Sequence, residues 1–172
     1  MDKTIIGIFV GSAIVLGAII FFATRQGGVA NPGALQGDEV KVMDSRRHVA
    51  VGEQHEPYTS NPPSSGPHWP QPAPWGIYPD EQHDEQLVHN LEHGGVNVFY
   101  KPGVPKDQIK RLEDFVRPYA TKVVLAPRSA NDTTIALASW GRILKLDTID
   151  DQKIKSFIAG NRNHGPEFVP DM

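Results

Sequence analysis

The sequence predicts a small α+β domain that follows a single N-terminal transmembrane helix. We expect a mixed or antiparallel sheet with helices on one face, together with a long ordered Pro-rich coil. Three observations support this prediction: an uncharged apolar run over residues 5–23, short β-branched or aromatic stretches in the second half, and intervening stretches with helical apolar spacing. The expected parts are a transmembrane anchor at 1–25, a flexible linker at 26–37 and an extracytoplasmic domain at 38–172.

The apolar run is long enough to cross a bilayer. Residues 5–23 contain no charged residue or proline, and at about 1.5 Å per residue they match the hydrocarbon thickness. A cleaved signal peptide is the alternative, although its apolar region is typically only about 7–15 residues long. We favour a single-pass anchor in the cell membrane with a cytoplasmic N-terminus. Gly7 and Gly11 are four residues apart, so this helix could pack closely against a subunit of a membrane complex.

The composition excludes several classes of function. The chain has no cysteine, so disulfides, thiolate metal sites and cysteine nucleophiles are absent. Its net charge of -3 and pI near 6.1 argue against a nucleic-acid-binding surface, and we expect no nucleic-acid partner. Six of the seven histidines lie between His48 and His93. Any metal chemistry is therefore expected in this segment.

The first part of the domain alternates between weak strand signals and a long coil. Residues 39–51 carry spaced valines and predict one or two short strands. Residues 57–79 contain eight prolines, which exclude a helix or a central strand. Because this stretch also carries Tyr58, Trp69, Trp75 and Tyr78, we expect it to pack over a core rather than to form a solvated linker.

The remaining elements follow in a regular order. Acidic residues at 80–85 are typical of a helix start, and Gly94 or Gly95 is suited to end that helix. Thr148 and Asp151 resemble a capping box for a last helix that extends to Ala159. Between these two helices we expect a strand at 96–100, a helix at 105–116, and strands at 122–125, 133–140 and 142–146.

A histidine pair on the first predicted helix is the main candidate for a site. His89 and His93 are four residues apart, so on a helix both imidazoles project from one face and can share an ion. The alternative is that they cap the helix or bond a core carbonyl. A metal needs further ligands, and His68 is the preferred third one because the preceding Gly66-Pro67 constrains the loop. Additional candidates are His55, His164, Met43 and Met172.

Glu92 lies between these histidines and completes a His-x-x-Glu-His pattern. This pattern occurs in zinc peptidases, where the glutamate is the general base. The chain lacks their length and a second acidic motif, so we expect Glu92 to accept an imidazole N–H, or to pair with another N–H or an arginine. A zinc-dependent hydrolase and a structural subunit without metal remain the alternatives to a binding role.

We expect the ion to be copper, with zinc as the alternative. Imidazole ligation with a methionine nearby suits copper, and cysteine-free copper proteins are compatible with a place outside the cytoplasm. The predicted role is metal handling, or that of an accessory subunit of a membrane redox complex, and binding is favoured over catalysis.

Two motifs are similar to those of an uncharacterised prokaryotic family, domain of unknown function 3105. They are Ser60-Asn61-Pro62-Pro63-Ser64-Ser65-Gly66-Pro67-His68 and Val88-His89-Asn90-Leu91-Glu92-His93-Gly94-Gly95-Val96. The resemblance covers roughly residue 55 to the C-terminus and implies a membrane segment followed by an extracytoplasmic domain. It supplies no activity, but it links the coil and the histidine helix as parts of one unit.

Overall fold

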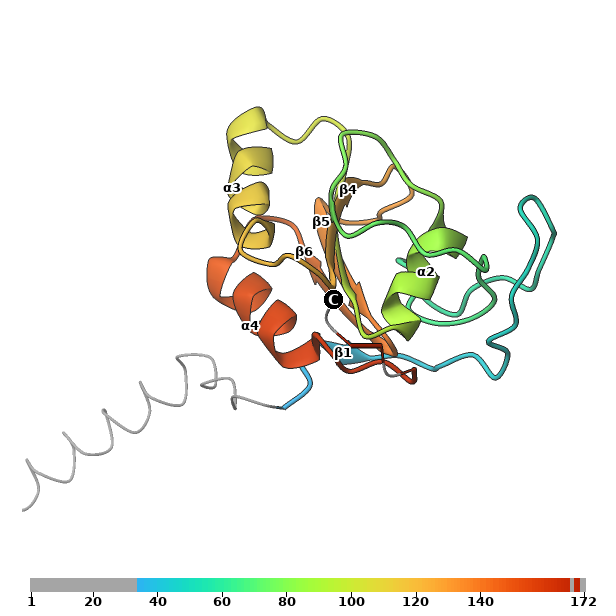
Figure 1. The fold of residues 1–172 in the computed structure, drawn as a ribbon. Coiled ribbons are helices and arrows are strands. Elements are labelled where there is room, and N and C mark those ends of the chain that lie inside the picture. The colour runs from blue at the N-terminus through green and yellow to red at the C-terminus, as the bar shows by residue number, and fades with distance from the viewer. Residues whose placement is uncertain (1–33, 168, 171–172) are drawn as a thin grey trace, which may run out of the picture. The chain divides into compact units, whose positions relative to one another are not determined.

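A computed structural model describes residues 34–167, 169 and 170, and it shows the predicted α+β architecture with a mixed sheet and three helices. Figure 1 shows the elements, with the chain coloured from blue to red. Six strands form one sheet: β1 (Asp38–Glu39), β2 (Gly76–Ile77), β3 (Val96–Tyr100), β4 (Val123–Pro127), β5 (Ile135–Ser139) and β6 (Arg142–Leu146). The helices are α2 (Asp84–Glu92), α3 (Lys106–Val116) and α4 (Asp151–Asn161).

The sheet has the strand order β1-β6-β5-β3-β4-β2. Strands β3 and β4 are parallel and are joined by α3, and β2 pairs in parallel with the outer side of β4. The other neighbours are antiparallel. A parallel pair needs a crossover connection, so α3 has to lie over one face of the sheet.

The prediction that all helices lie on one face is wrong. Helices α3 and α4 cover one face, where Leu112, Ile154 and Phe157 belong to one buried cluster with Val98 of β3. Helix α2 covers the opposite face (Figure 1). There its leucines belong to a second cluster, with Leu87, Leu91, Phe99, Val124 and Ala136 among its members. All residues of β3 are consequently buried, as expected for a strand covered on both sides.

The helix ends follow local rules, with small shifts from the predicted positions. Helix α4 is capped by Asp150, whose side chain accepts a hydrogen bond from the Lys153 amide at 3.0 Å, rather than by Thr148. Helix α2 begins at Asp84, later than the first acidic residues. It ends before Gly94, whose φ of 79° is positive. Glycine adopts such a conformation without steric cost.

The Pro-rich coil is packed against the domain, as predicted. Apart from the two residues of β2 it forms neither helix nor strand, although a single bridge pairs His48 with His68. Ser64, Ser65 and Ala73 are buried, and Trp75 and Tyr78 pack against the cluster on the α2 face. The coil therefore forms a wall beside α2.

The predicted membrane segment, residues 5–23, lies outside the described residues, as do the expected anchor at 1–25 and most of the linker at 26–37. Within the part of the chain that the structure describes, no helix combines the length and apolar character needed to cross a membrane.

Candidate metal centre

Four side chains meet where the coil faces α2 and form what we call the centre: His48, His68, His89 and Glu92. Each offers one ligand atom, and these atoms all lie within 4.8 Å of one another. Tetrahedral ligands at about 2.0–2.1 Å from an ion are about 3.4 Å apart. Side-chain rotations that bring the most distant ligand atoms closer by up to about 1.4 Å would therefore allow all four to contact one ion.

Backbone pairing fixes the position of His68, which is the most deeply buried histidine of the centre. Its amide donates to the Arg47 carbonyl at 3.2 Å, and its own carbonyl accepts from the Val49 amide at 2.8 Å. The residue is completely buried. Its Nδ1–H donates to the Gly66 carbonyl at 2.8 Å. Because the neutral ring has one N–H, its Nε2 carries a lone pair directed into the centre.

His89 has the same orientation, although it comes from the helix. Its Nδ1–H donates to the Trp69 carbonyl at 2.6 Å, so its Nε2 also presents a lone pair. Burial lowers the pKa of His89 below its ordinary value; the Trp69 bond partly opposes this effect, and the neighbouring His93, His68 and His48 add to it. A neutral imidazole is the form that binds a metal ion.

Glu92 is in an unfavourable contact when no ion is bound. Its Oε2 lies 2.9 Å from Nε2 of His68, a distance that ordinarily indicates a bond. The geometry is not that of a hydrogen bond, and Nε2 of His68 is a buried nitrogen without a hydrogen-bond partner. With His68 neutral and its proton on Nδ1, two electron-rich atoms lie 2.9 Å apart, and a cation bound to both would remove their repulsion. The Arg46 guanidinium lies 3.6 Å from Oε1 and offsets only part of this charge, because it is half exposed.

His48, which the sequence did not single out as a ligand, forms the outer side of the centre. Its ring lies 5.0 Å from that of His68 and stacks 5.2 Å from that of His89, measured between ring centroids. His48 is exposed, whereas the other three are buried. The only signal for it in the sequence was its position in the histidine-rich segment, since its proximity comes from the bridge with His68.

His93 lies beside the centre rather than in the group of four. Its Nε2 is 3.0 Å from Nε2 of His89 and 3.6 Å from a carboxylate oxygen of Glu167. Because Nδ1 of His89 is already the donor, His93 donates its Nε2–H to the His89 lone pair. His93 is therefore hydrogen-bonded to Nε2 of His89, the atom with which His89 would bind an ion.

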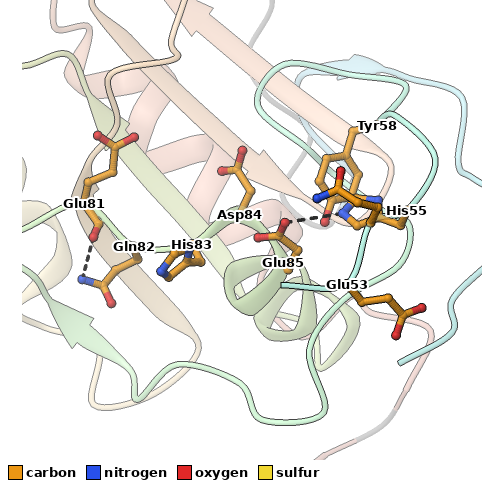
Figure 2. Close-up of a pocket in the computed structure, with 9 residues that line it drawn as sticks. Glu53, His55, Tyr58, Glu81, Gln82, His83, Asp84 and Glu85 are labelled. Carbon is orange, nitrogen blue, oxygen red and sulfur yellow. Dashed lines mark hydrogen bonds and ion pairs between the residues drawn. The ribbon is translucent and has the colours of Figure 1, made fainter. Parts of the chain in front are cut away.

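Among the described residues, His55 and His164 do not join the group of four. His55 lies in another pocket, where its Nε2 is 3.5 Å from Oε1 of Glu85 (Figure 2). The Met43 sulfur packs over Gly66, where a Cβ would lie 2.6 Å from it. His164 is exposed, and Met172 lies outside the described residues.

The coil motif supports His68 through several contacts. Ser65 accepts a hydrogen bond from the Met43 amide at 3.0 Å, and Gly66 has a positive φ of 123° that a side chain would strain. Arg128, which is buried, donates to Asn61 at 2.6 Å and to both oxygens of Asp84 at 2.8 Å. Arg128 thus joins the coil to the first residue of α2.

The helix motif supports His89 and Glu92 in a similar way. Buried Asn90 bonds the coil residue Ala73 twice, as acceptor from its amide at 2.9 Å and as donor to its carbonyl at 2.8 Å. A Cβ at Gly95 would lie 2.7 Å from the Trp75 ring, so glycine allows the coil to approach. Most residues of the two motifs therefore hold the coil and α2 together around the ligands.

The comparisons with known proteins supply a family but no activity. No curated protein and no solved structure matches the chain significantly. A family model matches residues 48–170, a range that begins at His48 and includes the whole centre. The chain belongs to the family described as protein of unknown function (DUF3105).

Proposed function

We propose that this domain binds one divalent transition-metal ion through His48, His68, His89 and Glu92. The observation that carries the proposal is the buried Nε2 of His68, which has no hydrogen-bond partner and faces a carboxylate oxygen at 2.9 Å. Backbone carbonyls hold His68 and His89 in the tautomer that a metal ligand needs. Imidazole lone pairs gathered around a carboxylate in a buried group repel one another, and a bound ion would relieve this repulsion.

The donor set also bears on the identity of the ion. Three imidazole nitrogens and one carboxylate oxygen, without sulfur, suit Cu²⁺ or Zn²⁺ better than Cu⁺. The methionine argument for copper gains no support, because the contact described for the Met43 sulfur is with Gly66 and not with a member of the group of four. We propose Cu²⁺ as the preferred ion, with zinc as the alternative. In the Irving–Williams order a given set of ligands has a higher affinity for Cu²⁺ than for Zn²⁺.

A binding role is favoured over hydrolysis. A general base acts on a water molecule and has to stay off the metal, whereas Oε2 of Glu92 lies within the ligand group itself. We therefore propose that Glu92 is a ligand rather than a base, and that the protein handles metal or serves as an accessory subunit of a membrane redox complex. Anchoring by residues 5–23, with the domain on the extracytoplasmic side, is part of this proposal and is supported by the apolar sequence.

Metal titration of the full-length protein in detergent tests the proposal. We expect binding of one Cu²⁺ per chain, with Zn²⁺ displaced at equal concentration, and a loss of at least about 100-fold in affinity for the His68→Ala variant. The control is His83→Ala, because His83 contacts Trp69 outside the centre. Equal binding by the wild type and the His68→Ala variant would contradict the proposal.

Membrane anchoring is tested separately by fractionation of cells. We expect the full chain in the membrane fraction and its domain accessible to protease only from the outside. Recovery of the full chain in the soluble fraction would contradict the anchor without affecting the metal proposal.

A further inference from the structure

His93 also lines a pocket of about 300 Å³ that the proposed metal centre does not use. This is the lower end of the volumes found for small-molecule sites, which are mostly apolar with a few polar groups. The apolar part of the wall comes from the coil and from the C-terminal segment: Pro72, Pro74, Trp75, Val169 and Pro170.

A buried lysine is the unusual feature of this pocket. Lys122 lines it and is only 3 % exposed. Its ammonium has three N–H donors, and it donates to the Val169 carbonyl. Among the described residues, no carboxylate lies within ion-pair distance of Lys122. Burying a cation without an anion is costly, so the pocket is suited to an anionic group.

The backbone holds Lys122 at this position despite strain. Its φ of 64° is in the left-handed region, which is uncommon for a residue other than glycine. The Lys122 carbonyl accepts from the Val96 amide at 2.9 Å, which joins it to the start of β3. Strained backbone that the surrounding structure maintains is found often at ligand sites.

We propose that this pocket binds a small apolar monocarboxylate. The carboxylate pairs with the Lys122 ammonium, and the apolar part lies against Trp75 and the prolines. Charge complementarity and the apolar wall together select this class over neutral or cationic molecules. The inference goes beyond the metal proposal and does not depend on it.

Benzoate is a suitable probe, with benzyl alcohol as its neutral counterpart. The experiment uses the metal-free full-length protein and follows the indole signal of Trp75 by NMR during titration. We expect saturable benzoate binding with a dissociation constant of about a millimolar or below. Benzyl alcohol should bind at least about tenfold more weakly, because it cannot form the charged hydrogen bond.

Variants assign the charge to Lys122. Lys122→Met should lose at least about tenfold in benzoate affinity, whereas Lys122→Arg, which keeps the cation, should stay within a few-fold of wild type. The exposed Lys106→Met is the control and should leave binding unchanged. If Lys122→Met does not fold, the affinities of the wild type for benzoate and benzyl alcohol show whether the pocket prefers an anion.

Three results would overturn the proposal. One is equal binding of benzoate and benzyl alcohol, and another is unchanged benzoate affinity in Lys122→Met. The third concerns Asp171, which follows the pocket residue Pro170 in the sequence. If benzoate binds only to the Asp171→Asn variant, the chain itself supplies the anion and the pocket is not a ligand site. Because the protein is free of metal throughout, these results are independent of the ion.

Discussion

Replacing Glu92 by glutamine should change the metal-free protein and the metal-loaded protein in opposite directions. In the metal-free protein, Oε2 of Glu92 faces the unpartnered Nε2 of His68 at 2.9 Å. A glutamine amide has nearly the same shape but can donate an N–H to that lone pair. The substitution therefore removes a repulsive contact, and a rotation of the amide lets its N–H point along the lone pair of Nε2.

The expected gain in the metal-free protein follows from these contacts. A new buried hydrogen bond contributes about 1 kcal/mol net. The lost ion pair with Arg46 offsets little, because the atoms are 3.6 Å apart and the Arg46 side chain is 50 % exposed, and such pairs are worth about 0–1 kcal/mol. The free energy of unfolding should rise by about 0–1 kcal/mol, which for a domain of this size is an increase of up to about 3–5 °C in Tm.

The metal-loaded protein should respond in the other direction. Loss of a partner that only orients a ligand costs about 10–100-fold in metal affinity, so loss of a ligand should cost at least about 100-fold. With free metal at about 100 times the wild-type Kd, the ion stabilises the wild type by about 2.7 kcal/mol. A variant with 100-fold weaker binding gains only about 0.4 kcal/mol under the same conditions.

Thermal unfolding with and without metal measures both effects. Glu113→Gln is the control, since Glu113 of α3 pairs with the exposed Arg117 just after that helix, and the substitution should leave the metal response unchanged. A Glu92→Gln protein that is less stable without metal, and that still gains the full stabilisation from the ion, would refute the assigned contact and its role.

Three further predictions concern His89, pH and Arg128. His89→Ala should bind the ion at least about 100-fold more weakly in a competition assay with a chelator, and retention of full occupancy would remove His89 from the site. Burial lowers the pKa of His89, so the unfolded chain takes up a proton at about pH 6.5 before the folded chain does. The stability of the metal-free protein should therefore fall as the pH decreases below about 6.5. In urea unfolding curves, His89→Gln should make the free energy of unfolding depend less on pH. An unchanged pH dependence would contradict the assignment of this effect to His89. Arg128→Met leaves Asp84 without its partner and should lower the free energy of unfolding by about 2–4 kcal/mol, against less than about 1 kcal/mol for the exposed Arg117→Met; equal losses would show that the buried ion pair is unimportant.

Elements with strong local patterns could be predicted from the sequence. The apolar spacing of residues 105–116 and the β-branched run of residues 96–100 predicted α3 and β3 to within one residue. The two residues of β2 carry no such pattern. Local periodicity also shows which side of a helix is apolar but not which face of a sheet it covers. For this reason the placement of α2 opposite α3 and α4 could not be predicted.

The centre shows the same distinction between local and tertiary information. His89 and Glu92 follow from spacing within one helix, and His68 from its constrained loop. His48 joins them only because the bridge between two extended segments places it beside His68, and no local pattern predicts that pairing. The role of Glu92 depends on its side-chain conformation, which directs Oε2 into the ligand group instead of toward an imidazole N–H.

The metal content of the full-length protein tests the central claim most directly. The wild type and a variant with His48, His68 and His89 all replaced by alanine would be loaded with Cu²⁺ or Zn²⁺, freed of loose ions by gel filtration, and measured by elemental analysis. We predict one ion per chain in the wild type and none in the variant. A wild-type protein that retains no ion, or a variant that retains one, would contradict the assignment of the centre.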